Sequence, residues 1–312
     1  MTMPSISRKS LESFYSDEYY RYFAKYFKKK NKILAFDYFR KLKKFFQLKK
    51  ASSFLELGGG YGFFSNLVSE YFRIKVDMIE LSKQGARYAN ENFKNVNVIE
   101  GSLESSATRF SKRFDVVFSG HLLEHLVSLR SYFSFASKLV KENGHILMFT
   151  PNADSLRYRI FRKYWGWAAP REHINFISQK GVRLLAKEYG LEIEILKSTI
   201  PHLVHYPSFL GSILRMIFQR RITRILQGGP AQKRREGTKA QRNGEDAPTS
   251  SGFQRSFVTI AKLIFIVLRI FSTIEYFLVF PMNFFLAKIG FADELLLIAR
   301  KNSKHRIEES YG

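Results

Sequence analysis

The sequence predicts an α/β fold built around a mostly parallel β-sheet, and three observations support this fold class. Short apolar runs that suit strands alternate with helical stretches over residues 51–199, which is typical of βαβ units. A glycine-rich turn follows the first apolar run, within residues 54–65, at the edge where such sheets bind their ligands. The chain has 312 residues, of which 45% are hydrophobic, so it can bury a sizeable core.

Residues 1–50 form the first expected element, a basic helical segment. Within residues 17–50, aromatic residues and lysines recur at helical spacing, so we expect one or two amphipathic helices. The aromatic stripe either packs on the core, with the lysines in solvent, or contacts a membrane or a substrate. The segment before it lacks the apolar run of a secretion signal, which favours a cytoplasmic location.

The sheet domain is expected to comprise residues 51–199 together with residues 292–303, which carry a last strand. Its four helices are expected within the alternating pattern, each after a strand, at residues 63–71, 82–93, 131–140 and 178–189. Its strands are expected at residues 53–57, 75–80, 95–100, 114–119, 144–150, 191–197 and 293–301.

Residues 200–291 interrupt this pattern and are expected to be an insertion before the last strand. Two apolar stretches, residues 200–218 and 257–291, flank a segment rich in Gly, Gln, Pro, Ser and charge. That composition cannot build a core, so we expect a disordered basic loop at about residues 226–254.

The glycine turn has the spacing E-x-G-x-G-x-G, from Glu56 to Gly62. Glycine is needed where the backbone turns sharply or where a ligand approaches it closely. The dinucleotide pattern G-x-G-x-x-G fails, because Phe63 stands where its third glycine is required. No Gly-Lys-Ser/Thr follows the turn, which excludes a P-loop as well.

The turn instead resembles the glycine motif of class I S-adenosylmethionine (SAM) methyltransferases. Glu80 ends the second expected strand, where an acid can bind the two ribose hydroxyls of a nucleoside. Residues 114–126, 144–152 and 172–193 extend the resemblance to a group that includes the ubiquinone-biosynthesis O-methyltransferases and polysaccharide-pathway methyltransferases. The resemblance covers about residues 11–199 and the final strand, and implies a Rossmann-like seven-stranded sheet with SAM as the cofactor.

The resemblance also implies a set of SAM-binding residues. Ser102 stands where the family commonly has an aspartate that contacts the adenine amine, and a serine could accept a hydrogen bond there. Three groups are implied: the methionine part of SAM is surrounded by Glu56, Gly58, Gly60 and Gly62, the ribose is held by Glu80, and the adenine and sulfonium region is lined by Ser102, Leu103 and Ser119.

A general base is needed only where the acceptor hydroxyl is weakly acidic, since the sulfonium donor is already activated. His121 and His173 are the favoured catalytic candidates, because both follow strand ends where donor and acceptor would meet. Glu124, His125 and Glu172 are further candidates, but their spacing is not diagnostic of a metal site, so no metal is predicted. The aromatic residues nearby form the wall of an acceptor pocket or a packing plug: Tyr164, Trp165 and Trp167.

Charge indicates the partner. The chain has 51 Lys and Arg against 27 Asp and Glu, a net charge of +24, which suits an anionic surface such as phospholipid or nucleic acid. Two membrane crossings by the insertion would export its basic loop, against the positive-inside rule. Lys262 and Arg269 share one helix face, so we expect an in-plane amphipathic helix that is broken near Pro281. The alternative is a helical subdomain packed on the core or on a second protomer.

These observations predict a SAM-dependent methyltransferase that is peripheral to the cytoplasmic face of an anionic membrane. We expect O-methylation of a membrane-resident acceptor, either a lipid-linked sugar or a quinone-like lipid. A nucleic-acid methyltransferase is disfavoured, because residues 119–123 lack the Asn/Asp-Pro-Pro-aromatic motif of amino-methylating enzymes with this fold. A non-enzymatic membrane scaffold on a degenerate methyltransferase fold is the second alternative.

Overall fold

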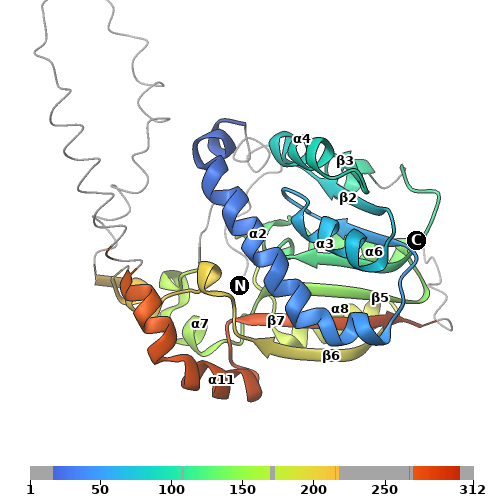
Figure 1. Ribbon diagram of the computed structural model, residues 1–312. Coiled ribbons are helices and arrows are strands. Elements are labelled where there is room, and N and C mark those ends of the chain that lie inside the picture. The colour runs from blue at the N-terminus through green and yellow to red at the C-terminus, as the bar shows by residue number, and fades with distance from the viewer. Residues whose placement is uncertain are drawn as a thin grey trace, which may run out of the picture.

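The computed structural model describes residues 17–106, 109–168, 173–214, 216, 217, 267 and 270–302. The loop expected at about residues 226–254 lies outside these ranges, as do Glu172, Lys262 and Arg269. The described residues form one seven-stranded sheet with helices on both faces (Figure 1).

The strand order of the sheet is β3-β2-β1-β4-β5-β7-β6. β7 runs antiparallel to both of its neighbours, β5 and β6, and the other pairs are parallel. This topology confirms the expected α/β fold of a class I methyltransferase. The strands are β1 (Phe54–Leu57), β2 (Val76–Glu80), β3 (Val96–Glu100), β4 (Phe114–Gly120), β5 (Val140–Pro151), β6 (Leu191–Thr199) and β7 (Glu294–Lys301).

Helices cover the two faces of the sheet because successive strand residues point to opposite sides. Phe54 and Phe118 pack on one face with α2 and α3, and α4 covers Met78 on that face. Leu55 and Val117 pack on the other face with α6 and α8. The helices are α2 (Asp17–Leu48), α3 (Phe63–Phe72), α4 (Lys83–Asn92), α5 (Leu103–Ser106), α6 (Leu129–Leu139), α7 (Leu156–Phe161), α8 (Gln179–Glu188) and α11 (Phe280–Lys288).

The basic amino-terminal segment forms a single long helix, α2, which lies across one face of the sheet (Figure 1). Its residues Tyr38, Leu42 and Phe46 are buried against the sheet and α3, so the aromatic stripe packs on the core. Gly120 permits this approach, because a Cβ there would lie 2.7 Å from the Tyr38 ring. The helix therefore covers the carboxyl edge of the sheet at the end of β4.

The last part of the insertion between β6 and β7 forms two apolar helices in the described structure. One comprises Ile270–Leu278 and the other is α11, and they are bent by 57° at Val279. Pro281 lies in the first turn of α11, where its missing N–H is tolerated, so the expected break near this residue is present. A short helix after β5, α7, was not expected from the sequence.

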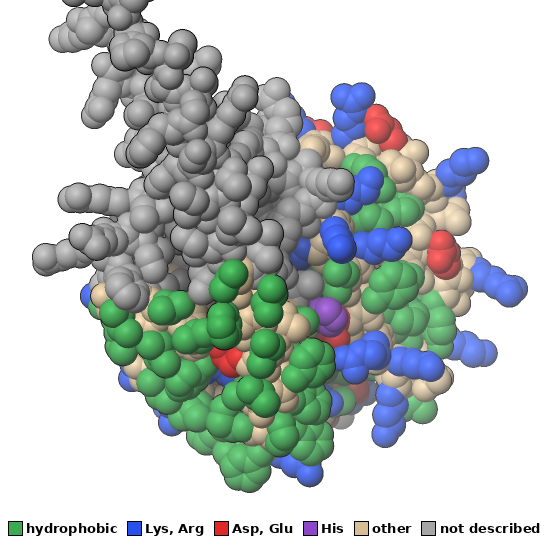
Figure 2. Space-filling model, turned by 60° about the vertical axis from the view of Figure 1, so that its left-hand side comes forward, with side chains coloured by type: hydrophobic (Ala, Val, Ile, Leu, Met, Phe, Trp, Pro, Cys, Tyr) green, Lys and Arg blue, Asp and Glu red, His purple; other side chains and the backbone are tan. Residues whose placement is uncertain are grey.

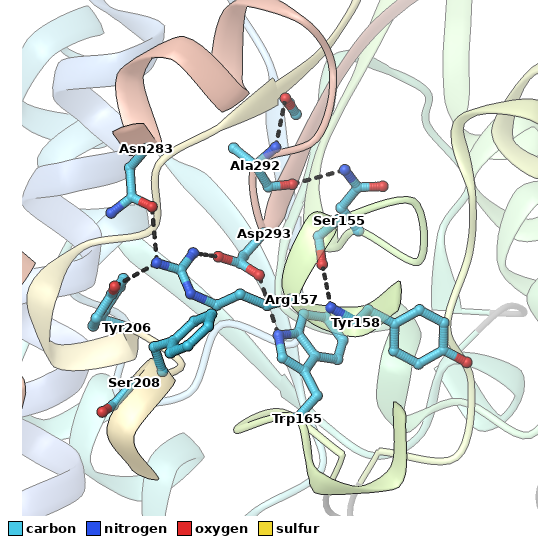
Figure 3. Close-up of polar contacts among 12 residues, drawn as sticks. Ser155, Arg157, Tyr158, Trp165, Tyr206, Ser208, Asn283, Ala292 and Asp293 are labelled. Carbon is cyan, nitrogen blue, oxygen red and sulfur yellow. Dashed lines mark hydrogen bonds and ion pairs between the residues drawn. The ribbon is translucent and has the colours of Figure 1, made fainter. Parts of the chain in front are cut away.

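A buried polar network attaches the insertion to the sheet domain (Figure 3). The Arg157 guanidinium on α7 donates to the Asp293 carboxylate, which directly precedes β7, and to the Tyr206 hydroxyl. It also donates to Asn283 Oδ1 on α11 at 2.8 Å. Trp165 Nε1 donates to the other Asp293 oxygen at 3.1 Å. Arg157 and Asp293 are almost fully buried, so a desolvated ion pair of the sheet domain holds the insertion through Tyr206 and Asn283.

Candidate functional site

The glycine turn lies at the carboxyl end of β1, as its sequence predicts. Gly58, Gly60 and Gly62 have φ values of 70°, 57° and 76°, a region that L-residues with a side chain rarely adopt. A Cβ on Gly60 would also lie 2.5 Å from Oδ1 of Asn31, which α2 places over the turn. The turn thus requires glycine both for its backbone shape and for the close approach of α2.

Two buried carboxylates support this turn. Glu80 ends β2 and accepts hydrogen bonds from the N–H groups of Gly60 at 2.6 Å and Ser82 at 2.7 Å. Glu56 accepts from the Ser65 hydroxyl at 2.5 Å, and burial raises the pKa of Glu56 to about 8. Burial also raises the pKa of Glu80, against the effect of its backbone hydrogen bonds. Glu80 therefore lies beside the turn, where a ribose ligand is expected.

The side chains of the residues expected around adenine and the sulfonium do not all face the glycine turn. Ser102 precedes α5, and its hydroxyl accepts from the Ser105 N–H at 3.2 Å, while Leu103 is buried at the start of that helix. The Ser119 hydroxyl is hydrogen bonded to the Tyr132 hydroxyl of α6 at 2.7 Å, inside the core on the opposite face from α2. The expectation for Ser119 therefore needs correction: its side chain does not face the turn, and only its main chain can line the site.

His121 follows β4 and is clamped between two carboxylates. Its Nδ1 is 2.8 Å from Glu124 Oε1, and its Nε2 is 3.0 Å from Glu294 Oε1. Burial opposes a charge on the ring, but the two carboxylates raise the pKa of His121 to about 9. His121 also has φ = 53°, an uncommon backbone conformation that is found most often at functional sites.

This clamp differs from the base role expected for His121. An imidazolium with both nitrogens bound to carboxylates cannot accept a proton from an acceptor hydroxyl. The arrangement instead fixes a positive charge at the end of β4. His121 therefore suits a positioning or electrostatic role better than that of a base.

His173 lies close to Glu124 and His125, so the structure brings together three of the expected candidates. The Nδ1 of His173 donates to the Trp167 carbonyl at 2.7 Å, which leaves Nε2 as an acceptor. Burial and the nearby His125 lower the pKa of His173 to about 3. One ligand atom from each of Glu124, His125 and His173 lies within 4.8 Å of the others, so these residues could hold a metal ion, although no metal was expected from their spacing.

The insertion brings a further histidine to this site that was not expected from the sequence. His205 packs edge-on against His121, with ring centroids 4.4 Å apart. Trp167 lies in the connection between α7 and α8, and its Nε1 donates to the His205 carbonyl at 2.8 Å. Trp165, in contrast, is fully buried in the polar network, so Trp165 is a packing residue and Trp167 is a site residue.

Glu294 is the second site residue that was not expected. It is the first residue of β7 and binds Lys41 of α2 at 2.5 Å and the Thr199 hydroxyl of β6 at 2.6 Å, besides His121. Burial opposes its charge, but Lys41 and His121 lower the pKa of Glu294 to about 2. Glu294 therefore links α2, the loop after β4 and both ends of the insertion.

The clamp predicts a defined pH dependence of stability. The pKa values of Glu124 and Glu294, about 2 against an ordinary 4.5, stabilise the fold above pH 4.5, and this contribution is lost as the pH falls through 2. The pKa of His121, about 9 against an ordinary 6.5, stabilises the fold below pH 6.5, and this contribution is lost as the pH rises through 9. The clamp should therefore contribute most between pH 4.5 and 6.5.

Urea unfolding of the wild type and His121→Gln at a series of pH values measures this contribution. The difference in the free energy of unfolding should be greatest between pH 4.5 and 6.5, and should shrink on both sides. Histidines whose pKa His121 does not influence, such as His145, titrate in both proteins and cancel. A difference that does not vary with pH would show that His121 is neutral in the folded protein.

Comparisons with known proteins show the family of this chain. The family model of a methyltransferase domain matches residues 23–195, more than half of the chain. A relative, the ubiquinone biosynthesis O-methyltransferase of Erwinia tasmaniensis, is 33% identical over 104 residues. That match covers 32% of this chain and 43% of the relative, less than half of the relative's length.

Solved structures of methyltransferases are also similar to this chain. A SAM-dependent methyltransferase from Archaeoglobus fulgidus is 16% identical with a TM-score of 0.49, and the match covers 91% of this chain and 100% of that one. A putative methyltransferase from Bacillus halodurans is 16% identical with a TM-score of 0.48, covering 85% of this chain and 98% of that one.

Proposed function

This chain belongs to the family of SAM-dependent methyltransferases, and from this premise we propose that it methylates a hydroxyl group of an acceptor that resides in a membrane. Family membership confirms the enzyme class and the cofactor expected from the glycine turn. The proposal about the acceptor rests on one observation, an apolar surface on the insertion that is joined to the site.

We call this surface the apolar platform. Ten large hydrophobic side chains of the two insertion helices and the residue after them are exposed, and Figure 2 shows them gathered on one part of the molecule. Contiguous exposed apolar surface of this kind marks a site of contact with a membrane or a protein. The platform consists of Ile270, Phe271, Ile274, Phe277, Leu278, Phe280, Met282, Phe284, Phe285 and Ile289.

Two polar residues of these helices, Glu275 and Asn283, face inward, the reverse of a helix in water. The Glu275 carboxylate accepts from the Phe209 and Leu210 N–H groups and from the Ser208 and Tyr206 hydroxyls. Asn283 accepts from Arg157 in the buried network. Because these two polar side chains are turned inward, most of the outward face is left to apolar side chains, which suits insertion into the headgroup and acyl boundary of a bilayer.

The charge of the chain supports an anionic membrane as the partner. The net charge of +24 attracts anionic lipid, and Figure 2 shows Lys and Arg side chains on the surface beside the platform. Within the part of the chain that the structure describes, no single helix has the length and apolar composition to span a bilayer, while the bent pair Ile270–Leu278 and Phe280–Lys288 does by these criteria alone. We place the enzyme at the cytoplasmic face of the membrane.

The acceptor is proposed to be a lipid-linked sugar or a quinone-like lipid. The name of the Erwinia tasmaniensis relative supports O-methylation and a quinone-like acceptor. The platform supports either acceptor, because both would be embedded by an apolar tail and would present their hydroxyls at the membrane surface.

Transfer of label from SAM tests this function. Purified protein and membranes of the source organism are incubated with methyl-labelled SAM, and the lipids are then extracted into organic solvent. We expect label in the lipid fraction with the wild type and none with Gly60→Arg, because a side chain at the positive φ of Gly60 would also collide with Asn31. Label in nucleic acid instead of lipid, or SAM binding without any transfer, would contradict the proposal.

A further inference from the structure

We infer that His205, which the insertion supplies, receives the proton of the acceptor hydroxyl during methyl transfer. This inference rests on the proposed function and assigns a residue to its acceptor side. The Nδ1 atom of His205 is buried and has no hydrogen-bond partner among the described residues, and no other histidine nitrogen of the described structure is orphaned in this way. An unpaired buried polar atom at a site is costly, unless a ligand satisfies it.

The position of His205 is fixed by its main chain, while Nδ1 stays without a partner. Its N–H donates to the His202 carbonyl at 2.7 Å, and its own carbonyl accepts from Trp167 Nε1 at 2.8 Å. Its ring packs edge-on against His121 at 4.4 Å and against Trp167 at 5.9 Å. The imidazole is therefore held beside His121, which follows β4 at the edge of the sheet where donor and acceptor meet.

Ring nitrogens of two other histidines at this edge are already engaged. Both ring nitrogens of His121 are bound to carboxylates, and Nδ1 of His173 donates to the Trp167 carbonyl. The remaining side of His173 faces Glu124 and His125. His205 is consequently the imidazole of this edge that is best placed to accept a new hydrogen bond.

His205 is neutral before the acceptor binds. Burial, together with nearby cations that include Lys30 and His121, holds the pKa of His205 well below its ordinary value. The ring is therefore neutral at neutral pH. With its proton on Nε2, Nδ1 offers a lone pair to a hydroxyl.

The chemical step balances with this base. The acceptor oxygen attacks the methyl carbon of SAM, and a C–O bond forms as the bond between that carbon and the sulfonium sulfur breaks. The sulfonium becomes the neutral thioether of S-adenosylhomocysteine. The hydroxyl proton passes to His205 Nδ1, and the imidazolium releases it to solvent afterwards.

Because His205 lies in the insertion, it connects the apolar platform to the proton transfer. The next residue, Tyr206, contacts both Arg157 and Glu275, the two groups that hold the platform helices. An acceptor that approaches along the platform therefore meets His205, which lies in the same insertion. The insertion thus supplies both the membrane surface and the base.

The test compares initial rates of lipid labelling from methyl-labelled SAM, with membranes of the source organism as the acceptor probe. We expect His205→Ala to lower the rate by about 100-fold or more, the range of general-base catalysis. SAM affinity and vesicle flotation should stay at wild-type values. His202→Ala, three residues earlier on the same segment, is the matched control and should retain the wild-type rate within about threefold.

One further variant and a rescue experiment separate a base from a structural role. His205→Asn places an amide oxygen near the position of Nδ1 and should keep the fold but not the rate, and added imidazole should restore part of the rate of His205→Ala. Wild-type rates in both His205 variants would overturn the inference but not the proposed function. The same would follow if His205→Ala were slow and not rescued by imidazole while His205→Asn were fully active, because His205 would then have only a structural role. Absence of lipid label with the wild type would overturn the proposed function, and the inference with it.

Discussion

Vesicles that contain anionic lipid should float the wild-type protein and leave a Phe277→Glu/Leu278→Glu variant in the dense fraction. These two side chains are 65% and 76% exposed, the highest values on the platform. Withdrawing each from the acyl boundary costs about 1.5 kcal/mol or more, so the pair should weaken partitioning by at least about 100-fold. The added carboxylates also repel anionic lipid.

The control for flotation replaces two equally exposed hydrophobic residues outside the platform. Val127 and Leu184 are 58% and 60% exposed, and Val127→Glu/Leu184→Glu adds the same charge. This control variant should float like the wild type. Equal flotation of both variants would contradict membrane docking by the platform, and an oligomer that forms without vesicles and is broken only by the platform variant would identify the surface as an interface between copies.

The glycine turn and the positions of the strands follow from local sequence patterns, which explains why they could be predicted. Glu56, Gly58 and Glu80 lie within two consecutive βα units, so their spacing along the chain fixes their positions in space. The alternation of side chains along β4 also explains where the Ser119 side chain points. Phe118 faces α2, so the next residue must point to the opposite face, towards Tyr132.

The clamp around His121 could not be predicted because it joins distant segments. Glu294 reaches His121 only because β7 inserts between β5 and β6, which pairs Glu294 with Pro151 and with Thr199. The register of these antiparallel pairs depends on the path of the insertion, and no local pattern of residues specifies it. His205 was missed for the same reason, since it lies in a part of the insertion without a regular pattern.

Replacing Arg157 by methionine should destabilise the protein by about 3 to 5 kcal/mol, the cost of removing one partner from a buried ion pair. Burial of Asp293 raises its pKa, and the Arg157 guanidinium opposes this shift. Without the guanidinium, the Asp293 carboxyl would be buried with no cation to compensate its charge. The Tyr206 hydroxyl and Asn283 Oδ1 would also lose their donor. Urea unfolding of the purified variant measures the loss.

Arg130→Met is the control, because Arg130 forms an exposed ion pair with Glu188. Its replacement should lower the free energy of unfolding by less than about 1 kcal/mol. The double variant Arg157→Met/Asp293→Asn removes the uncompensated charge and keeps an acceptor for Trp165 Nε1. It should therefore be more stable than Arg157→Met alone. If Arg157→Met and Arg130→Met were equally stable, the network would not hold the insertion, and the platform and His205 would need another anchor.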